Sequence, residues 1–147
     1  MKRIFIQIFL AITVLSGYSQ NPDNEELKKA NAFLRFDPVE VNLGSIEVAK
    51  VDENTGNVEI FVYNDGAKPL IISQVTACCG TTVKEWPRQP IAPGQKGSIK
   101  VYFRVEPRPV RISRTVTVNS NAANGAVQKL AILGEVVLSK HSNEIQL

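Results

Sequence analysis

The sequence holds few residues able to carry covalent or metal chemistry: among 147 residues there are two cysteines, one histidine, one tryptophan and one methionine. The histidine, His141, lies in a polar segment near the C-terminus, whereas a rigid scaffold holds a catalytic histidine in place. Two cysteines and this remote histidine do not supply the four ligands of a closed zinc site. The carboxylates are scattered, and the sequence has no phosphate-binding glycine loop. The composition therefore favours a non-enzymatic chain without a cofactor.

Long apolar runs are also missing, apart from one at the N-terminus. There a basic start precedes an apolar stretch over residues 4–15, and Gly17 and Ser19 place small side chains where a signal peptidase cleaves. The stretch is shorter than the roughly twenty residues of a membrane-spanning helix. We expect residues 1–19 to be a cleaved signal peptide that directs the chain to the periplasm or out of the cell. No cysteine lies at the cleavage point, so we expect neither a lipid anchor nor a membrane span after cleavage.

A strong excess of one charge is absent as well. The 17 basic side chains include Lys2 and Arg3 of the signal, so 15 basic and 14 acidic side chains remain after cleavage, a net charge of +1. A nearly neutral chain has no long-range attraction for nucleic acid. We expect a polar leader over residues 20–32, one domain over 33–138 and a polar tail over 139–147. The leader has the charge spacing of a short helix, but one or two turns rarely hold alone, so we expect it to be mobile.

Alternation of apolar and polar residues predicts strands through most of the remaining chain. From Ile99 to Val105 every second residue is apolar, and the residues between them are polar, charged or aromatic. Similar patterns predict further strands over residues 39–46, 58–63, 70–77, 110–119 and 128–137. Short strands with one apolar face pack as two facing sheets. The sequence thus predicts an all-β sandwich of about seven antiparallel strands, with helix nearly absent.

One charged residue interrupts this alternation. Arg114 falls between Ile112 and Val116, on the face of its strand that is otherwise apolar. An unpaired buried guanidinium is energetically costly. We therefore expect a β-bulge near Ser113 that turns Arg114 outward.

Five segments stand out in their order along the chain: NDGAKPLII at 64–72, CGTTVKEWP at 79–87, PIAPG at 90–94, TVTVNSN at 115–121 and LAILGEV at 130–136. Together they resemble the bacterial secreted family called domain of unknown function 1573. The resemblance covers about residues 33–137 and implies an immunoglobulin-like domain of the Hydin type, in agreement with the expected sandwich. It implies a fold and no particular activity.

The two cysteines, Cys78 and Cys79, are adjacent and follow an expected strand. The family pattern is usually Cys-Gly-Cys-Thr; alignment on Trp86 places Cys79 at its first cysteine and Thr81 at its second, so Cys78 is additional. A bond between neighbours would be strained, because their Cα atoms lie about 3.8 Å apart and disulfides prefer roughly 4.4–6.8 Å. Three interpretations stay open: small residues at a strand end, a labile redox-active pair, or a site for a soft metal such as Cu(I).

A partner surface is the other candidate site. Tyr102 and Arg104 point out of one expected strand and Arg111 out of the next, so a hairpin of the two would bring them onto one face. Such a face suits an anionic glycan or an acidic protein patch, and the alternative is an ordinary solvated face. Trp86 is a further candidate because tryptophan is enriched in interface hot spots. Its alternative is a core anchor at the end of the sandwich.

These observations favour an exported, non-catalytic binding or structural module that contacts a protein or a cell-envelope glycan. The residues expected at its partner surface are Trp86, Tyr102, Arg104 and Arg111. The alternative is a thiol-based redox or Cu(I)-handling protein that uses Cys78 and Cys79.

Overall fold

The computed structural model describes residues 22–139. The signal peptide predicted at 1–19 lies outside the described residues, as does the tail from residue 140 onward, which includes His141. Among the described residues, no helix has the length and apolar character needed to cross a membrane.

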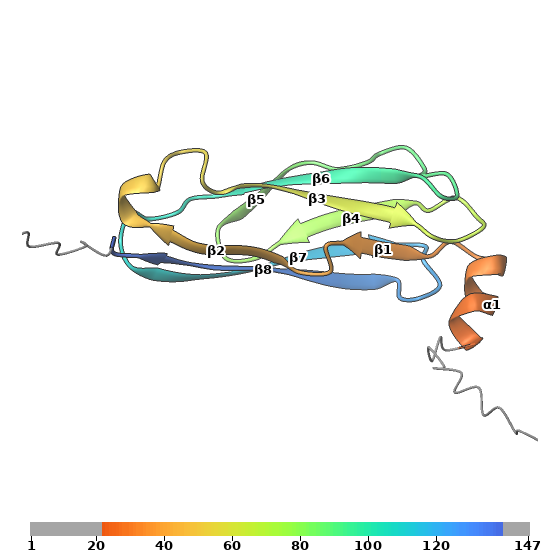
Figure 1. The fold of residues 1–147 in the computed structure, drawn as a ribbon. Helices are drawn as coiled ribbons and strands as arrows, with labels where there is room; N and C mark the ends of the chain where they lie inside the picture. Colours follow the sequence, from red (N-terminus) through yellow and green to blue (C-terminus); the bar gives the residue numbers. More distant parts are fainter. Residues whose placement is uncertain (1–21, 140–147) are drawn as a thin grey trace, which may run out of the picture.

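Two four-stranded sheets pack face to face (Figure 1). In spatial order, the first consists of β1 (Leu34–Asp37), β3 (Asn57–Asn64), β6 (Lys96–Phe103) and β5 (Thr81–Glu85). The second consists of β2 (Val41–Glu47), β8 (Val127–Val137), β7 (Val110–Ser120) and β4 (Ile72–Ala77). The all-β sandwich predicted from the sequence is confirmed. It has eight strands, and one pair, β2 with β8, is parallel.

The core lies between the inner faces of both sheets. Alternate residues of β3 and β6 point inward and are buried, including Ile60 and Ile99, which are fully shielded from solvent. Val116 and Leu130 close the core from the second sheet and are equally buried. Burial of one face per strand accounts for the alternation in the sequence.

The leader contains a helix where the sequence led us to expect a mobile segment. Helix α1 (Pro22–Ala30) carries acidic residues in its first turn and basic residues in its last turn, which suits the helix dipole. Its C-terminal end is held by the domain, because the Ala67 amide donates to the carbonyl oxygens of Lys28 at 2.8 Å and Asn31 at 2.9 Å. The sequence shows the charge spacing of this helix but not its contact with Ala67, so mobility of the leader stays a prediction.

Five connections cross from one sheet to the other, and two of them position the candidate sites. Residues 104–109 join β6 of the first sheet to β7 of the second, so the hairpin expected between these strands is wrong. Residues 78–80 join β4 to β5, which are the edge strands of the two sheets and contact each other. The cysteines therefore lie where the chain passes between the sheets along one flank of the sandwich.

Candidate functional site

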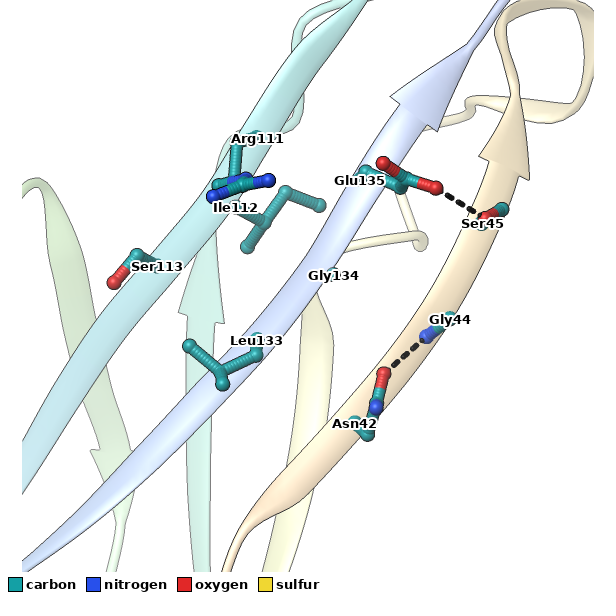
Figure 2. A pocket seen from close by; sticks show the side chains of 9 residues that line it. All are labelled: Asn42, Gly44, Ser45, Arg111, Ile112, Ser113, Leu133, Gly134 and Glu135. Atoms are coloured by element: carbon teal, nitrogen blue, oxygen red, sulfur yellow. Dashed lines mark hydrogen bonds between the residues drawn. The ribbon is translucent and has the colours of Figure 1, made fainter.

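A bulge in β2 forms a depression on the outer face of the second sheet. Asn42 lies opposite Leu133 and Ser45 opposite Glu135, so β2 has one residue more than β8 over this interval. Gly44 has a φ of +66°, a left-handed conformation that glycine adopts readily. The depression beside this bulge measures about 480 Å³ (Figure 2), which is in the usual size range of ligand sites.

The close approach of β2 to β8 at the floor of the depression favours a glycine. A Cβ atom on Gly134 would lie 3.0 Å from the Cβ atom of Leu43 and 3.3 Å from the carbonyl oxygen of Gly44. Both distances are tighter than ordinary contacts between such atoms. The absence of a side chain at Gly134 therefore lets Leu43 and Gly44 of β2 lie close beside β8.

Arg111 projects beside this depression as an unpaired cation. Glu135 lies opposite it on β8, but Figure 2 shows the Glu135 carboxylate turned toward Ser45, whose hydroxyl donates to it at 2.5 Å. In the part of the chain that the structure describes, Arg111 takes part in no ion pair. Ser113 adds another polar side chain to the lining. The site thus offers a guanidinium, two hydroxyl groups and one side-chain amide, beside the Glu135 carboxylate that Ser45 holds.

Tyr102 and Arg104 lie on the first sheet and its outgoing connection, away from Arg111. They line a separate depression of about 410 Å³ together with Asp52 and Glu53. The Nε atom of Arg104 lies 3.3 Å from a carboxylate oxygen of Glu106. The residues of the expected cationic face therefore lie on two different sheets. Around Tyr102, the positive charge of Arg104 is offset by acidic side chains.

Trp86 is partly buried and packs against the hydrophobic core. The guanidinium carbon of Arg88 lies 3.7 Å from the centroid of the Trp86 ring, in a cation–π contact. This placement is that of a core anchor at the flank of the sandwich. A role of Trp86 in binding a partner stays a prediction.

The cysteines occupy a tight turn. The Thr81 amide donates to the Cys78 carbonyl oxygen at 3.2 Å, and the two central residues, Cys79 and Gly80, have φ values of 62° and 73°. Positive φ at both central positions is the signature of a type I′ turn. The turn presents both thiols to solvent as free cysteines, with their Sγ atoms 2.9 Å apart.

Arg114 points between the sheets near this turn, so the expected bulge that turns it outward is wrong. The pairing of β7 with β8 runs without a register shift through Arg114. Its guanidinium carbon lies 5.4 Å from the Phe103 ring centroid, and Nη1 donates to the Ser113 carbonyl oxygen at 3.1 Å. Nε of Arg114 and the hydroxyl of Thr81 are buried, and neither has a hydrogen-bond partner among residues 22–139. The interrupted alternation in the sequence marked Arg114, but we assigned it to the wrong side of the strand.

The two thiols differ in acidity. The pKa of Cys78 is lowered, mainly because the Cys79 thiol donates a hydrogen bond to it, with a further contribution from the backbone of Thr115. The pKa of Cys79 is raised, mainly by the same hydrogen bond and then by desolvation, although the charge of Arg114 opposes this shift. The pair therefore ionises first at Cys78.

Comparison with protein-family models assigns the chain to a family. The model of the family described as protein of unknown function, DUF1573, matches residues 34–136. The chain belongs to this family. The resemblance inferred from the five sequence segments is confirmed over almost the same range. No curated protein matches the DUF1573 chain.

Solved structures similar to this DUF1573 domain share its fold. A protein of unknown function from Porphyromonas gingivalis W83 matches with a TM-score of 0.55 and 18% identity, over 71% of this chain and 46% of its own. The secreted serine protease VesC from Vibrio cholerae matches with a TM-score of 0.53 and 10% identity, over 78% of this chain and 24% of VesC. A PapD-like domain of human CEP192 matches with a TM-score of 0.50 and 6% identity, over 75% of this chain and 89% of that domain. The chain thus spans about half of the Porphyromonas protein and about a quarter of VesC.

Two of the segments that carry the DUF1573 resemblance, at 64–72 and 90–94, meet at Asn64. Asn64 is fully buried, and its side-chain amide donates to the carbonyl oxygens of Lys68 at 2.7 Å and Ile91 at 2.9 Å. Its Oδ1 atom accepts from the Gly66 amide at 3.0 Å. A Cβ atom on Gly66 would lie within 2.2 Å of the Asn31 carbonyl oxygen. The NDG segment is therefore a structural junction rather than a binding site.

Alkylation tests the unequal thiols directly. In the reduced protein, iodoacetamide is expected to modify Cys78 faster than Cys79, and from a lower pH, because the thiolate is the reacting species and the Cys78 thiolate forms first. Peptide mapping by mass spectrometry at a series of pH values measures both rates. Cys79→Ala removes the hydrogen-bond donor and should shift the Cys78 profile to higher pH. Identical profiles for both thiols would contradict this assignment.

Proposed function

We propose that this DUF1573 protein is an exported, non-catalytic interaction module that binds anionic groups of a protein or a cell-envelope glycan at the depression around Arg111. The observation that carries the proposal is the unpaired Arg111 guanidinium beside a preformed depression, with the neighbouring Glu135 carboxylate held by Ser45. A guanidinium binds carboxylate, sulfate and phosphate groups through paired hydrogen bonds. Export rests on the signal peptide expected at residues 1–19.

The edges of the sandwich are less suited to a partner than its faces. Proteins often bind an extended peptide by adding it as a strand to a free sheet edge. Here β1 has only four residues, and each of the other edge strands, β2, β4 and β5, contains a register shift. Short and bulged edges hinder strand addition. This favours recognition by side chains on a sheet face, where Arg111 lies.

The remaining groups of the depression suit a polar ligand. Asn42 accepts a hydrogen bond from the Gly44 amide at 2.8 Å, which leaves its side-chain NH2 group available as a donor. Ser113 lies exposed on β7, which β8 separates from β2. Hydroxyl and amide groups around one cation provide orientation as well as charge.

Binding of defined anionic probes tests this function. An oligo-glutamate peptide and an oligogalacturonate represent the two sources of carboxylate, and calorimetry gives the Kd of each. Arg111→Ala should weaken binding of the preferred probe by about tenfold or more, since a hydrogen bond to a charged group contributes about 1.5–3 kcal/mol. Lys129→Ala is the matched control, because Lys129 is an exposed cation on the same sheet. The attraction should weaken as salt is added.

Three results would contradict the proposal: no binding of either probe, equal Kd values for Arg111→Ala and Lys129→Ala, or loss of binding only in Arg104→Ala. The last result would assign binding to the depression that contains Tyr102. Which probe binds more tightly distinguishes an acidic protein segment from an acidic glycan.

Thiol chemistry at Cys78 and Cys79 is the second candidate function. The observation that favours it is the contact between two exposed sulfur atoms in one turn. Redox exchange and Cu(I) handling would both use these sulfurs, because two thiolates suit a soft ion.

A further inference from the structure

The cysteine turn is held from both ends. The Cys78 amide donates to the Thr115 carbonyl oxygen at 3.1 Å, and the Thr81 amide donates to the Cys78 carbonyl oxygen at 3.2 Å. These bonds fix the backbone at the point where the chain leaves β4 for β5. The thiols themselves stay exposed, so an external reagent reaches them while the backbone beneath them is fixed.

An internal Cys78–Cys79 bond does not fit this turn well. Neighbouring Cα atoms are about 3.8 Å apart, whereas disulfides prefer roughly 4.4–6.8 Å. The Sγ atoms lie 2.9 Å apart, against about 2.05 Å in a disulfide, and the backbone hydrogen bonds on either side of the pair resist the rearrangement that closure would require. Oxidation of this pair is therefore expected to favour a bond to another molecule.

The surroundings of the pair favour negative charge. Arg114 takes part in no ion pair among the described residues, its Nε atom has no hydrogen-bond partner, and its charge acts on Cys79. The Cys79 thiol donates to the sulfur of Cys78, which stabilises a thiolate there. An anionic reagent is thus attracted to the site by Arg114, and a cationic one is repelled.

We propose that Cys78 is a thiol–disulfide exchange site that takes up small anionic disulfides as a mixed disulfide. The Cys78 thiolate attacks one sulfur of the incoming disulfide, the disulfide bond breaks, and a new bond joins Cys78 to that sulfur. The other half leaves as a thiolate and takes a proton from water. The number of disulfide bonds is unchanged, and Cys79 stays a thiol. This inference rests on the thiol candidate and not on the Arg111 depression, so each can fail alone.

The test compares two disulfides of opposite charge on the reduced, signal-free protein. Oxidised glutathione is the anionic probe and cystamine the cationic one, at equal concentration and low salt, with acid quenching, intact mass and peptide mapping. We expect one glutathione half on Cys78, no adduct in Cys78→Ser, and the same adduct in Cys79→Ser. Arg114→Gln should slow the reaction with oxidised glutathione relative to cystamine by about tenfold. Lys129→Gln, which removes a cation elsewhere on the same sheet, should leave this ratio unchanged.

Several results would overturn the proposal. A mass two hydrogens below that of the reduced protein, without an adduct, would show an internal disulfide. An adduct on Cys79 would show that Cys79, and not Cys78, is the exchanging thiol. Absence of any reaction would also overturn the proposal. So would an equal ratio of the oxidised glutathione rate to the cystamine rate in Arg114→Gln and in the unsubstituted protein. Circular dichroism checks that each variant is folded. Urea-denatured protein gives the ratio of the oxidised glutathione rate to the cystamine rate for the same thiols when the turn is absent.

Discussion

Replacement of Asn64 by alanine is expected to lower the free energy of unfolding by about 4 kcal/mol. Its side chain donates to the carbonyl oxygens of Lys68 and Ile91 and accepts from the Gly66 amide, all at 2.7–3.0 Å. Asn64 is fully buried, so alanine would leave the Lys68 carbonyl oxygen and the Gly66 amide without this partner and largely without water, whereas the Ile91 carbonyl oxygen keeps its bond from the Leu70 amide. Each buried polar group left unsatisfied costs about 1–3 kcal/mol.

Urea denaturation followed by tryptophan fluorescence measures this loss. Asn57→Ala is the matched control, because Asn57 is exposed and its side-chain amide donates within the turn to Asn54. We expect the control to change the unfolding free energy by less than about 0.5 kcal/mol. Equal losses in the two variants would contradict the role of Asn64 as the junction between the segments at 64–72 and 90–94.

Phe103→Ala is expected to have the other large effect, a loss of about 3–5 kcal/mol in the free energy of unfolding. The Phe103 side chain is 1% exposed and fills the core near the cysteine turn, where Thr81 pairs with it. Alanine would leave a cavity and would remove the ring on which the Arg114 guanidinium lies. Thermal and urea unfolding measure the loss, and the disulfide exchange rate reports whether Arg114 has shifted.

Phe61→Ala is the control for this prediction. Phe61 lies on the outer face of the same sheet, half-buried, with the Lys96 ammonium 4.5 Å from its ring centroid. Its removal should cost about 1 kcal/mol or less. If Phe61→Ala were as destabilising as Phe103→Ala, the inward and outward faces of the first sheet would be wrongly assigned.

The alternation of apolar and polar residues predicted the sandwich because most of its strands bury one face and expose the other. Six of the eight strands were expected from the sequence, and the two that were missed, β1 and β5, have four and five residues. Strands this short show too few repeats of the pattern to be recognised. Helix α1 was underestimated because its stabilising contact, from Ala67, comes from a distant segment.

The candidate sites depend on contacts that a sequence does not display. Nothing in residues 104–109 indicates whether they return in the same sheet or cross to the other, so the separation of Arg104 from Arg111 became visible only in the structure. The depression beside Gly44 requires the pairing of β2 with β8, which joins residues about ninety positions apart. Arg114 was noticed as an exception, but its accommodation against Phe103 follows from tertiary packing.

The central claim, that the depression around Arg111 is the binding site, is tested most directly by nuclear magnetic resonance. Titration of the isotope-labelled protein with the preferred anionic probe should shift the amide signals of Ser45, Arg111, Ser113 and Glu135, together with the Nε–H signal of Arg111. The signals of Tyr102 and Arg104 should stay in place. Shifts centred on Tyr102 and Arg104, or spread evenly over exposed cations, would contradict the account.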